Sequence, residues 1–197
     1  MVQLLNNHQH IYLFDNVLSD VECEYLQKVI DKYSNCEEKH GYQSNVQSKT
    51  IAVPELPYEK TRQRVVQLLE KITKDIFSKY KLGMSRVSDM EYPLLRKITG
   101  ATRMHMDGII VSSIIDMENK TLHLDKVREL SMIIALNSDY EGGELCFPDQ
   151  NFEVKLKRGQ VLLFPPYWTH PHKTNELKND TVRYTVTTWL TCEHDYK

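Results

Sequence analysis

The sequence predicts a mainly β, α+β fold in which an antiparallel double-sheet β structure is backed by two or more N-terminal helices. Two observations predict it. Up to about residue 82, apolar residues recur at helical spacing, whereas from residue 85 onward short apolar runs alternate with Gly, Pro, Asn and Asp. A chain of 197 residues fits one domain over 1–197. We expect a helical support over 15–82 and a β core over 85–191.

Two helices are predicted from capping and periodicity. Ser19 and Glu22 form a capping-box pattern, so the first helix is expected from Ser19 to about Ser34. The second is expected to start near Pro57, because proline fits the first turn of a helix, and to end at Gly83. Both helices are expected to pack an apolar stripe on one sheet. The stripe of the second comprises Val65, Leu68, Leu69, Ile72, Ile76 and Tyr80.

Strands are predicted where short apolar or β-branched runs lie between turn residues. They are expected near 11–14, 43–50, 85–92, 94–98, 102–107, 130–137, 143–147, 152–157, 161–164 and 182–191. The rest of 35–55 is expected to be loop, and 111–129 an inserted loop that acts as a lid. Recognition of the substrate is expected to rest on these two segments.

The composition excludes several classes of protein. Hydrophobic residues make up 41% and charged residues 26%, and the formal net charge is -2, values that are ordinary for a soluble globular protein. Without a long basic run, nucleic acid is not an expected partner. The chain has no signal-peptide pattern and no apolar run near the roughly 20 residues of a membrane span. Four cysteines without a C-x-x-C pair indicate reduced thiols. We expect a cytoplasmic protein without a membrane partner; the sequence does not indicate its oligomeric state.

Two histidines and an aspartate are the candidate metal ligands. In a strand, residues i and i+2 point to the same face, so His105 and Asp107 are expected to project together. His172 supplies a second imidazole from a distant segment. Two histidines and one carboxylate on one face form the triad of non-haem iron(II) oxygenases, which leaves coordination positions open for a co-substrate and dioxygen.

Two alternatives compete with this assignment. The chain carries a second H-x-D pair, His123 and Asp125, but only the first pair is followed directly by a glycine that permits a turn, Gly108. His170 also shares a face with His172 if that segment is extended, and the triad needs only one of them.

Arg183 is the candidate partner of a 2-oxo acid. It lies in a strongly β-prone run, residues 181–189. A 2-oxo acid that chelates the metal through its keto and adjacent carboxylate oxygens has a far carboxylate that needs a fixed cation. A guanidinium binds a carboxylate in a planar, bidentate manner, which makes Arg183 suitable.

From these residues outward, the chain resembles the prolyl 4-hydroxylase-like branch of the 2-oxoglutarate/Fe(II)-dependent dioxygenase superfamily over about residues 85–191. The matching segments, in order, are HMD at 105–107, LSMIIALN at 130–137, YEGGEL at 140–145, FP at 147–148, VLLFP at 161–165, PH at 171–172, RY at 183–184 and W at 189. The resemblance implies that the β core is a double-stranded β-helix, or jelly roll.

The resemblance also implies a site. Fe(II) is bound by His105, Asp107 and His172, and 2-oxoglutarate by Arg183; these four are the expected catalytic residues. The family's spacing from Phe164 favours His172 over His170. Relatives often carry a tyrosine at the position of Ala135, so Ser131 and Thr187 are predicted as further donors to 2-oxoglutarate. Oxidation by O2 is implied to be coupled to decarboxylation of 2-oxoglutarate to succinate, with ascorbate as a reductant.

Three functions remain open from the sequence. The first is hydroxylation of a peptidyl side chain such as proline, and the second is the same chemistry on a free amino acid or another small metabolite. The third is a cupin-like metal-binding module without catalysis. Arg183 separates the third function from the others, because such a module has no need of a cation for a keto acid.

Overall fold

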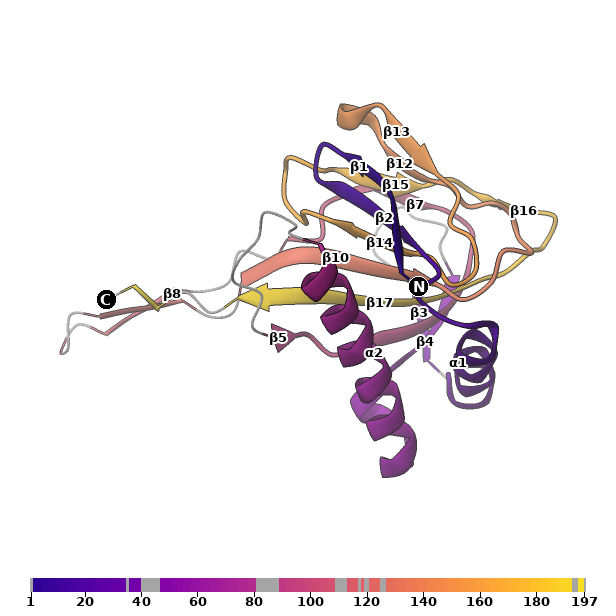
Figure 1. Cartoon of the computed structure of the whole chain (residues 1–197), viewed down its shortest axis with the longest axis horizontal. Helices are drawn as coiled ribbons and strands as arrows, with labels where there is room; N and C mark the ends of the chain where they lie inside the picture. The colour runs from indigo at the N-terminus through magenta and orange to yellow at the C-terminus, as the bar shows by residue number, and fades with distance from the viewer. Residues whose placement is uncertain are drawn as a thin grey trace.

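A computed structural model describes residues 2–34, 36–39, 47–80, 89–108, 113–116, 118, 121–124, 127–192 and 195–196. Figure 1 shows three layers in the body of the molecule. Helices α1 (Asp20–Tyr33) and α2 (Glu59–Lys79) lie on the lower side. A large sheet that contains β10 (Val127–Ala135) and β17 (Arg183–Cys192) lies above them, and a smaller sheet lies on top.

The large sheet has nine strands within the described part of the chain, and every pairing is antiparallel. Its order is β1-β2-β14-β10-β17-β6-β4-β3, with β5 paired to β17. The strands other than β10 and β17 are β1 (Gln3–His8), β2 (Ile11–Asp15), β3 (Cys36–Lys39), β4 (Gln47–Ala52), β5 (Asp89–Met90), β6 (Leu94–Thr99) and β14 (Val161–Phe164).

The smaller sheet faces the large one and has the order β13-β12-β15-β7. Its strands are β7 (Thr102–His105), β12 (Leu145–Phe147), β13 (Phe152–Val154) and β15 (His172–Thr174). A two-stranded ribbon joins β11 (Glu141–Gly142) to β16 (Leu177–Lys178). Short 3-10 helices span Val53–Glu55 and Pro148–Gln150. Two facing antiparallel sheets form the double-sheet structure that the strand pattern predicts and the jelly roll that the resemblance implies.

The two helices follow the predicted patterns. Ser19 caps α1: its side chain accepts from the Glu22 main-chain N–H while the Glu22 carboxylate accepts from the Ser19 main-chain N–H. The second helix begins at Glu59, just after Pro57, and its predicted end at Gly83 lies outside the described residues. The stripe positions Val65, Leu69, Ile72 and Ile76 are buried, and Leu68 and Tyr80 are partly buried. None of the helices in the described ranges is long and apolar enough to cross a membrane.

The large sheet has two different faces because side chains alternate along a strand. On β10, Leu130, Met132 and Ile134 pack with both helices in the main core. The intervening Ile133 and Ala135 pack toward the smaller sheet, in a second core with Leu145 and other residues of that sheet. The prediction that both helices cover one sheet is therefore confirmed, and the opposite face is left for the space between the two sheets.

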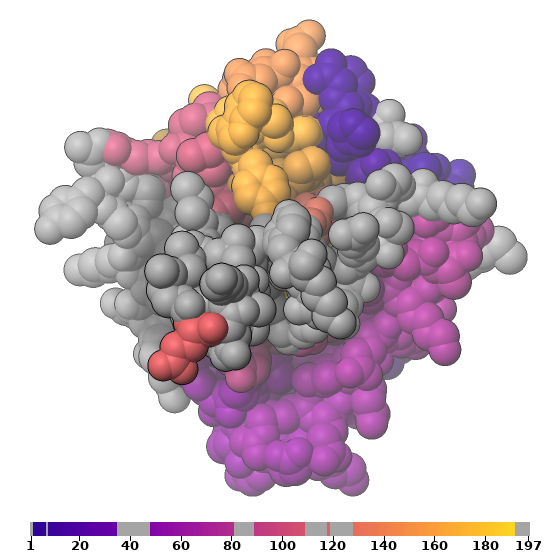
Figure 2. All heavy atoms as spheres, turned by 90° about the vertical axis from the view of Figure 1, so that its left-hand side faces the viewer, coloured from indigo at the N-terminus to yellow at the C-terminus, as the bar shows by residue number. Residues whose placement is uncertain are grey.

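The loop prediction for 111–129 was wrong, and that for 35–55 was wrong in part: β4 overlaps the strand predicted at 43–50, whereas β3 was not predicted. The described parts of 111–129 form β8 (Ser113–Asp116) and β9 (Thr121–Leu124), which pair with each other and with β18 (Asp195–Tyr196). Within 35–55, β3 and β4 extend the large sheet through β6. Both segments pair with strands far away in the sequence, which local composition does not reveal. Figure 1 shows that the β8–β9–β18 sheet projects from one side of the molecule. Seen from that side, α2 lies at the bottom of the molecule and residues of the smaller sheet lie toward the top (Figure 2).

Candidate active site

His105 and His172 are directly opposite each other on neighbouring strands. His105 ends β7, His172 begins β15, and the two are paired in the antiparallel ladder. Paired residues share a face, and their rings are 4.4 Å apart between centroids. His172 is buried against Phe147 and Phe164, whereas the His105 side chain remains 42% exposed. The smaller sheet thus fixes side by side two imidazoles that are 67 positions apart in the sequence.

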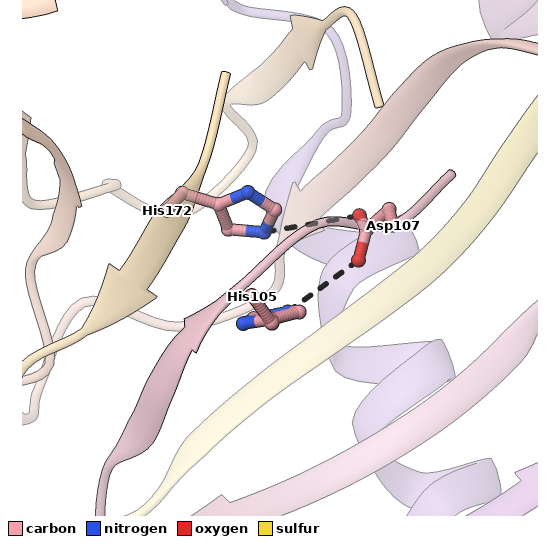
Figure 3. A group of neighbouring side chains, drawn as sticks. All are labelled: His105, Asp107 and His172. Atoms are coloured by element: carbon pink, nitrogen blue, oxygen red, sulfur yellow. Dashed lines mark ion pairs between the residues drawn. The ribbon is translucent and has the colours of Figure 1, made fainter. Parts of the chain in front are cut away.

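Asp107 lies just beyond the end of β7 and turns its carboxylate toward both rings (Figure 3). Its Oδ1 is 3.4 Å from His105 Nε2, and its Oδ2 is 3.8 Å from His172 Nε2. The Ser131 hydroxyl donates to the same Oδ2 at 2.7 Å. The expected i, i+2 placement therefore brings the carboxylate to His105, although Asp107 itself is not part of the strand.

Main-chain carbonyls hold the Nδ1 side of both rings. The Nδ1 of His105 is 2.8 Å from the carbonyl of Arg103, and the Nδ1 of His172 is 3.2 Å from the carbonyl of His170. A carbonyl only accepts, so each Nδ1 carries a proton, and in the neutral ring each Nε2 is then the nitrogen that can bind a metal ion beside Asp107. Metal-binding histidines are commonly oriented in this way.

The electrostatics favour a cation between the three side chains. Burial alone would raise the pKa of Asp107, but its hydrogen bonds with His105 and Ser131 and the nearby His172 ring hold it below its usual range. Burial lowers the pKa of His172, which favours the neutral form that a metal ligand needs. Burial also opposes the charged form of His105, but its bonds to Asp107 and to the Arg103 carbonyl outweigh burial and raise its pKa.

The donor set fits iron(II). One atom from each of the three side chains lies within 4.8 Å of the others, close to twice a metal–ligand bond of about 2 Å. Two imidazole nitrogens and one carboxylate are the ligands of non-haem iron(II) oxygenases, and the thiols of Cys23 and Cys146 lie outside this group.

The structure separates the alternative histidines from this group. Thr169 and the carbonyl of Gln9 contact the two ring nitrogens of His170, at 2.9 and 2.7 Å. His170 thus has no ring nitrogen left to share an ion with Asp107. His123 belongs to β9 in the projecting sheet, and its partner Asp125 lies outside the described residues.

A cavity of about 550 Å³ opens on the three side chains. It lies between the two sheets and is lined by residues of β4, β6, β7, β10, β12, β15 and β17. His105, Asp107 and His172 lie on its wall, and Arg183 lines it from β17 in the large sheet. Cavities of this size are typical of small-molecule sites.

Arg183 is a buried cation in that cavity. It is 5% exposed, and burial lowers the pKa of its guanidinium. Its Nη1 donates to the Gly143 carbonyl at 2.9 Å, while its Nε is buried without a hydrogen-bond partner among the described residues. A buried charge with unfilled donors is costly unless an anion binds it. The far carboxylate of 2-oxoglutarate has the charge and the planar shape to do so.

The structure distinguishes the two further donors predicted for 2-oxoglutarate and adds a third. Thr187 lines the cavity, whereas the Ser131 hydroxyl is engaged with Asp107. Thr185 was missed: it is 1% exposed, lines the cavity and has a buried hydroxyl without a described partner. Its position two residues after Arg183 in a strand, which places both on one face, is the signal that could have found it.

Comparisons with known proteins agree with this geometry. Residues 95–191 match the family model described as the 2OG-Fe(II) oxygenase superfamily. A PKHD-type hydroxylase of Prochlorococcus marinus (strain NATL1A) is 30% identical over 108 residues, which cover 50% of this chain and 47% of that protein. The chain thus spans about half the length of the curated relatives it matches.

Solved structures share the fold at low identity. A viral collagen prolyl hydroxylase from Paramecium Bursaria Chlorella virus-1 is 18% identical, with a TM-score of 0.65 over 93% of this chain and 96% of that chain. A Trichoplax adhaerens prolyl hydroxylase, in complex with a hypoxia inducible factor peptide fragment, is 18% identical with a TM-score of 0.61 over 93% and 84%. These neighbours confirm the double-stranded β-helix. The residues matched by the family model and the similarity to the PKHD-type hydroxylase show that the chain belongs to the 2OG-Fe(II) oxygenase superfamily.

Proposed function

We propose that this chain is a hydroxylase that uses Fe(II), 2-oxoglutarate and O2 to hydroxylate a peptidyl side chain, such as that of proline. One observation carries the proposal. His105, Asp107, His172 and the buried cation Arg183 all line a single cavity. A metal-binding module without catalysis has no use for a buried arginine at this place, so this observation favours the oxygenase over the cupin-like alternative.

Each residue has a role that its contacts support. The Nε2 atoms of His105 and His172 and the carboxylate of Asp107 hold iron(II), which supplies the activation of O2 when 2-oxoglutarate is bound. Arg183 binds the far carboxylate of 2-oxoglutarate, with hydroxyl donors from Thr185 and Thr187. Ser131 orients the Asp107 carboxylate through the hydrogen bond to Oδ2. The balanced reaction converts R–H, 2-oxoglutarate and O2 into R–OH, succinate and CO2.

The peptide substrate is supported by the mouth of the cavity and by one neighbour. Met104 lines the cavity and is 47% exposed, and Met106, the residue after His105, is 53% exposed, so an apolar side chain is presented at the site. Exposed apolar residues at a cavity mouth are typical of surfaces that bind a polypeptide. The Trichoplax adhaerens neighbour was solved with a peptide fragment. Ascorbate as a reductant and the extent of one domain over 1–197 stay predictions.

The experiment is succinate release with Fe(II) and 2-oxoglutarate across a panel of proline-containing peptides and free amino acids. We expect release to depend on added Fe(II) and on a peptide, and His105→Ala or Asp107→Ala to abolish it. His170→Gln is the matched histidine control and is expected to retain turnover, because His170 faces Gln9 and Thr169. Turnover with free amino acids alone would establish the small-molecule alternative. Metal binding without succinate under any condition would favour the cupin-like module.

A further inference from the structure

Asp107 is the one residue of the candidate metal site that no strand holds. Its neighbour His105 ends β7, and His172 lies in β15, so both imidazoles are fixed by the ladder of the smaller sheet. Three hydrogen bonds hold the segment 107–108 instead. Ser131 donates to the Asp107 side chain, the Gly108 N–H donates to the Pro166 carbonyl at 2.7 Å, and Arg128 Nη1 donates to the Asp107 main-chain carbonyl at 2.5 Å.

Arg128 is itself held from three sides. Its Nε and Nη2 form a two-pronged ion pair with Glu91, at 2.6 and 2.7 Å, and its guanidinium lies 3.7 Å above the ring of Trp189. Its main-chain carbonyl accepts a hydrogen bond from the Tyr167 hydroxyl. The Arg128 side chain is 11% exposed and that of Glu91 35%, and the two-pronged geometry of the pair fixes the guanidinium plane.

Glu91 is hydrogen-bonded to β17, the strand that contains Trp189. The Glu91 N–H donates to the Trp189 carbonyl at 2.9 Å, and the Thr188 hydroxyl donates to the Glu91 carbonyl at 2.7 Å. Trp189 in turn lines the cavity. Arg128 therefore joins the Asp107 segment, which leaves the smaller sheet, to β17 of the large sheet.

A bulge in β10 directs Arg128 toward this position. The register between β10 and β17 shifts between Arg128 and Leu130, so Glu129 is an extra residue in the ladder. Without it, Arg128 would share the helix-facing side of the sheet with Leu130, which packs in the main core. The extra residue turns the arginine to the face that carries Ser131 and the site.

We propose that Arg128 is a positioning residue for metal binding: it fixes the main chain of Asp107, and thereby the carboxylate, against the large sheet. The proposal rests on the proposed function, because Asp107 must be a metal ligand for its position to matter. Outer contacts of this kind commonly change metal affinity by about 10–100-fold. Arg128 does not touch the metal in this scheme and acts only through Asp107.

The test measures Mn(II) affinity of the metal-free protein by electron paramagnetic resonance of the free ion, with thermal unfolding measured in parallel. We expect Arg128→Met to raise the Kd for Mn(II) at least tenfold. The matched control is Arg62→Met on α2. Arg62 makes similar contacts far from the site: its Nε and Nη2 donate to Glu59 Oε2, and its Nη1 donates to the Leu56 carbonyl. It is expected to leave the Kd within twofold of the parent value.

Two further variants keep the outcome decisive. If Arg128→Met does not fold, Arg128→Lys and Glu91→Gln replace it, and each is expected to raise the Kd severalfold and to alter the visible absorption of bound Co(II). Affinity and Co(II) spectrum unchanged in every folded variant at these positions would overturn the positioning role. Asp107→Ala separates this failure from that of the proposed function. Parent-like Mn(II) affinity in Asp107→Ala would show that Asp107 is not a ligand, and both proposals would then be wrong.

Discussion

Arg183 and the triad contribute opposite charges to one cavity from opposite sheets. Asp107 carries the negative charge on the smaller sheet's side, and Arg183 lies buried on β17 with an unfilled Nε. A hydrogen bond to a charged group contributes about 1.5–3 kcal/mol, and leaving such a group buried and unsatisfied costs a comparable amount. In the proposed function, a dicarboxylate that reaches from the metal to Arg183 would remove this cost and complete the cavity electrostatically.

Arg183→Met is therefore expected to raise the KM for 2-oxoglutarate by about 10–100-fold, since each 1.4 kcal/mol corresponds to a factor of ten. Arg183→Lys keeps the charge but loses the planar guanidinium, so its KM for 2-oxoglutarate is expected to lie between those of the parent protein and Arg183→Met. The measurement is succinate release against 2-oxoglutarate concentration, with Arg62→Met as the control for a distant arginine. A KM within twofold of the parent value in Arg183→Met would mean that the arginine is structural.

Thr185 gives a narrower prediction. Thr185→Val keeps the shape of the side chain and removes the hydroxyl, which has no described partner in the fold. We expect a severalfold higher KM for 2-oxoglutarate, equivalent to about 1 kcal/mol, with no loss of stability. Thr191→Val is the matched control, because the Thr191 hydroxyl is also buried without a described partner but Thr191 does not line the cavity. Equal effects in both variants would contradict a role in binding.

At the scale of single residues, the sequence points to candidate site residues more readily than to the contacts that these residues make. The spacing of His105 and Asp107 and the β-prone context of Arg183 make these side chains candidates, because the i, i+2 rule is local, whereas the resemblance is needed to favour His172 over His170. The contact of Ser131 with Asp107 could not be predicted, because the two residues are 24 positions apart and Asp107 lies beyond the end of β7. Arg128 was overlooked for a similar reason: only the pairing of β10 with β17 creates the bulge.

Among the elements, the helices were predictable and several strands were not. Helix signals are local: a cap, a period of 3.6 and a first-turn proline. The strand β1 was missed because it is a polar edge strand, Gln3–His8, held by its pairing with β2 rather than by an apolar pattern. The strands β8 and β9 were read as loop because their third partner, β18, lies at the far end of the chain.

The capping box of α1 supports a prediction at this scale. Ser19→Ala is expected to lower the free energy of unfolding by about 1 kcal/mol, because it removes one of two reciprocal cap bonds. The measurement is urea unfolding, with Ser78→Ala near the end of α2 as an exposed serine control. Loss of equal size in both variants would contradict the capping role.

Glu22 makes the same cap dependent on pH. Burial opposes its ionisation, but the bonds from Ser19 and the charge of Lys71 hold the pKa of Glu22 below its ordinary value. A depressed carboxyl pKa stabilises the fold above the unfolded pKa, and this contribution is lost as the pH falls through the folded value. The free energy of unfolding of Glu22→Gln, measured with urea, is expected to vary less between pH 5 and pH 3 than that of the parent protein. Identical pH dependence of the two proteins would argue against it.

At the scale of the molecule, the site is assembled by the packing of two sheets. The histidines belong to the smaller sheet and Arg183 to the large one, and the apolar contacts between Ile133, Leu145 and Phe164 keep the two apart at a fixed spacing. Ligands that span the cavity should therefore stabilise the whole fold. Without O2, Mn(II) and 2-oxoglutarate, each at about 100 times its Kd, are expected to add about 2.7 kcal/mol apiece to the free energy of unfolding.

This stabilisation is measured by urea unfolding with and without the two ligands. Asp107→Ala is the control and is expected to lose most of the metal-dependent part. Equal stability of the parent protein with and without ligands would mean that the two sheets do not share one binding site.

β17 presents Arg183, Thr185, Thr187 and Trp189 to the cavity and the intervening Val186 and Leu190 to the helices. A shift of one residue in the pairing of β17 would exchange these two sets of side chains. The Arg183 guanidinium would then lie in the apolar core, and valine and leucine would face the cavity. A misaligned chain would thus lose its interior and its chemistry in the same step. In the proposed function, 2-oxoglutarate would therefore bind only a chain in which β17 is correctly aligned.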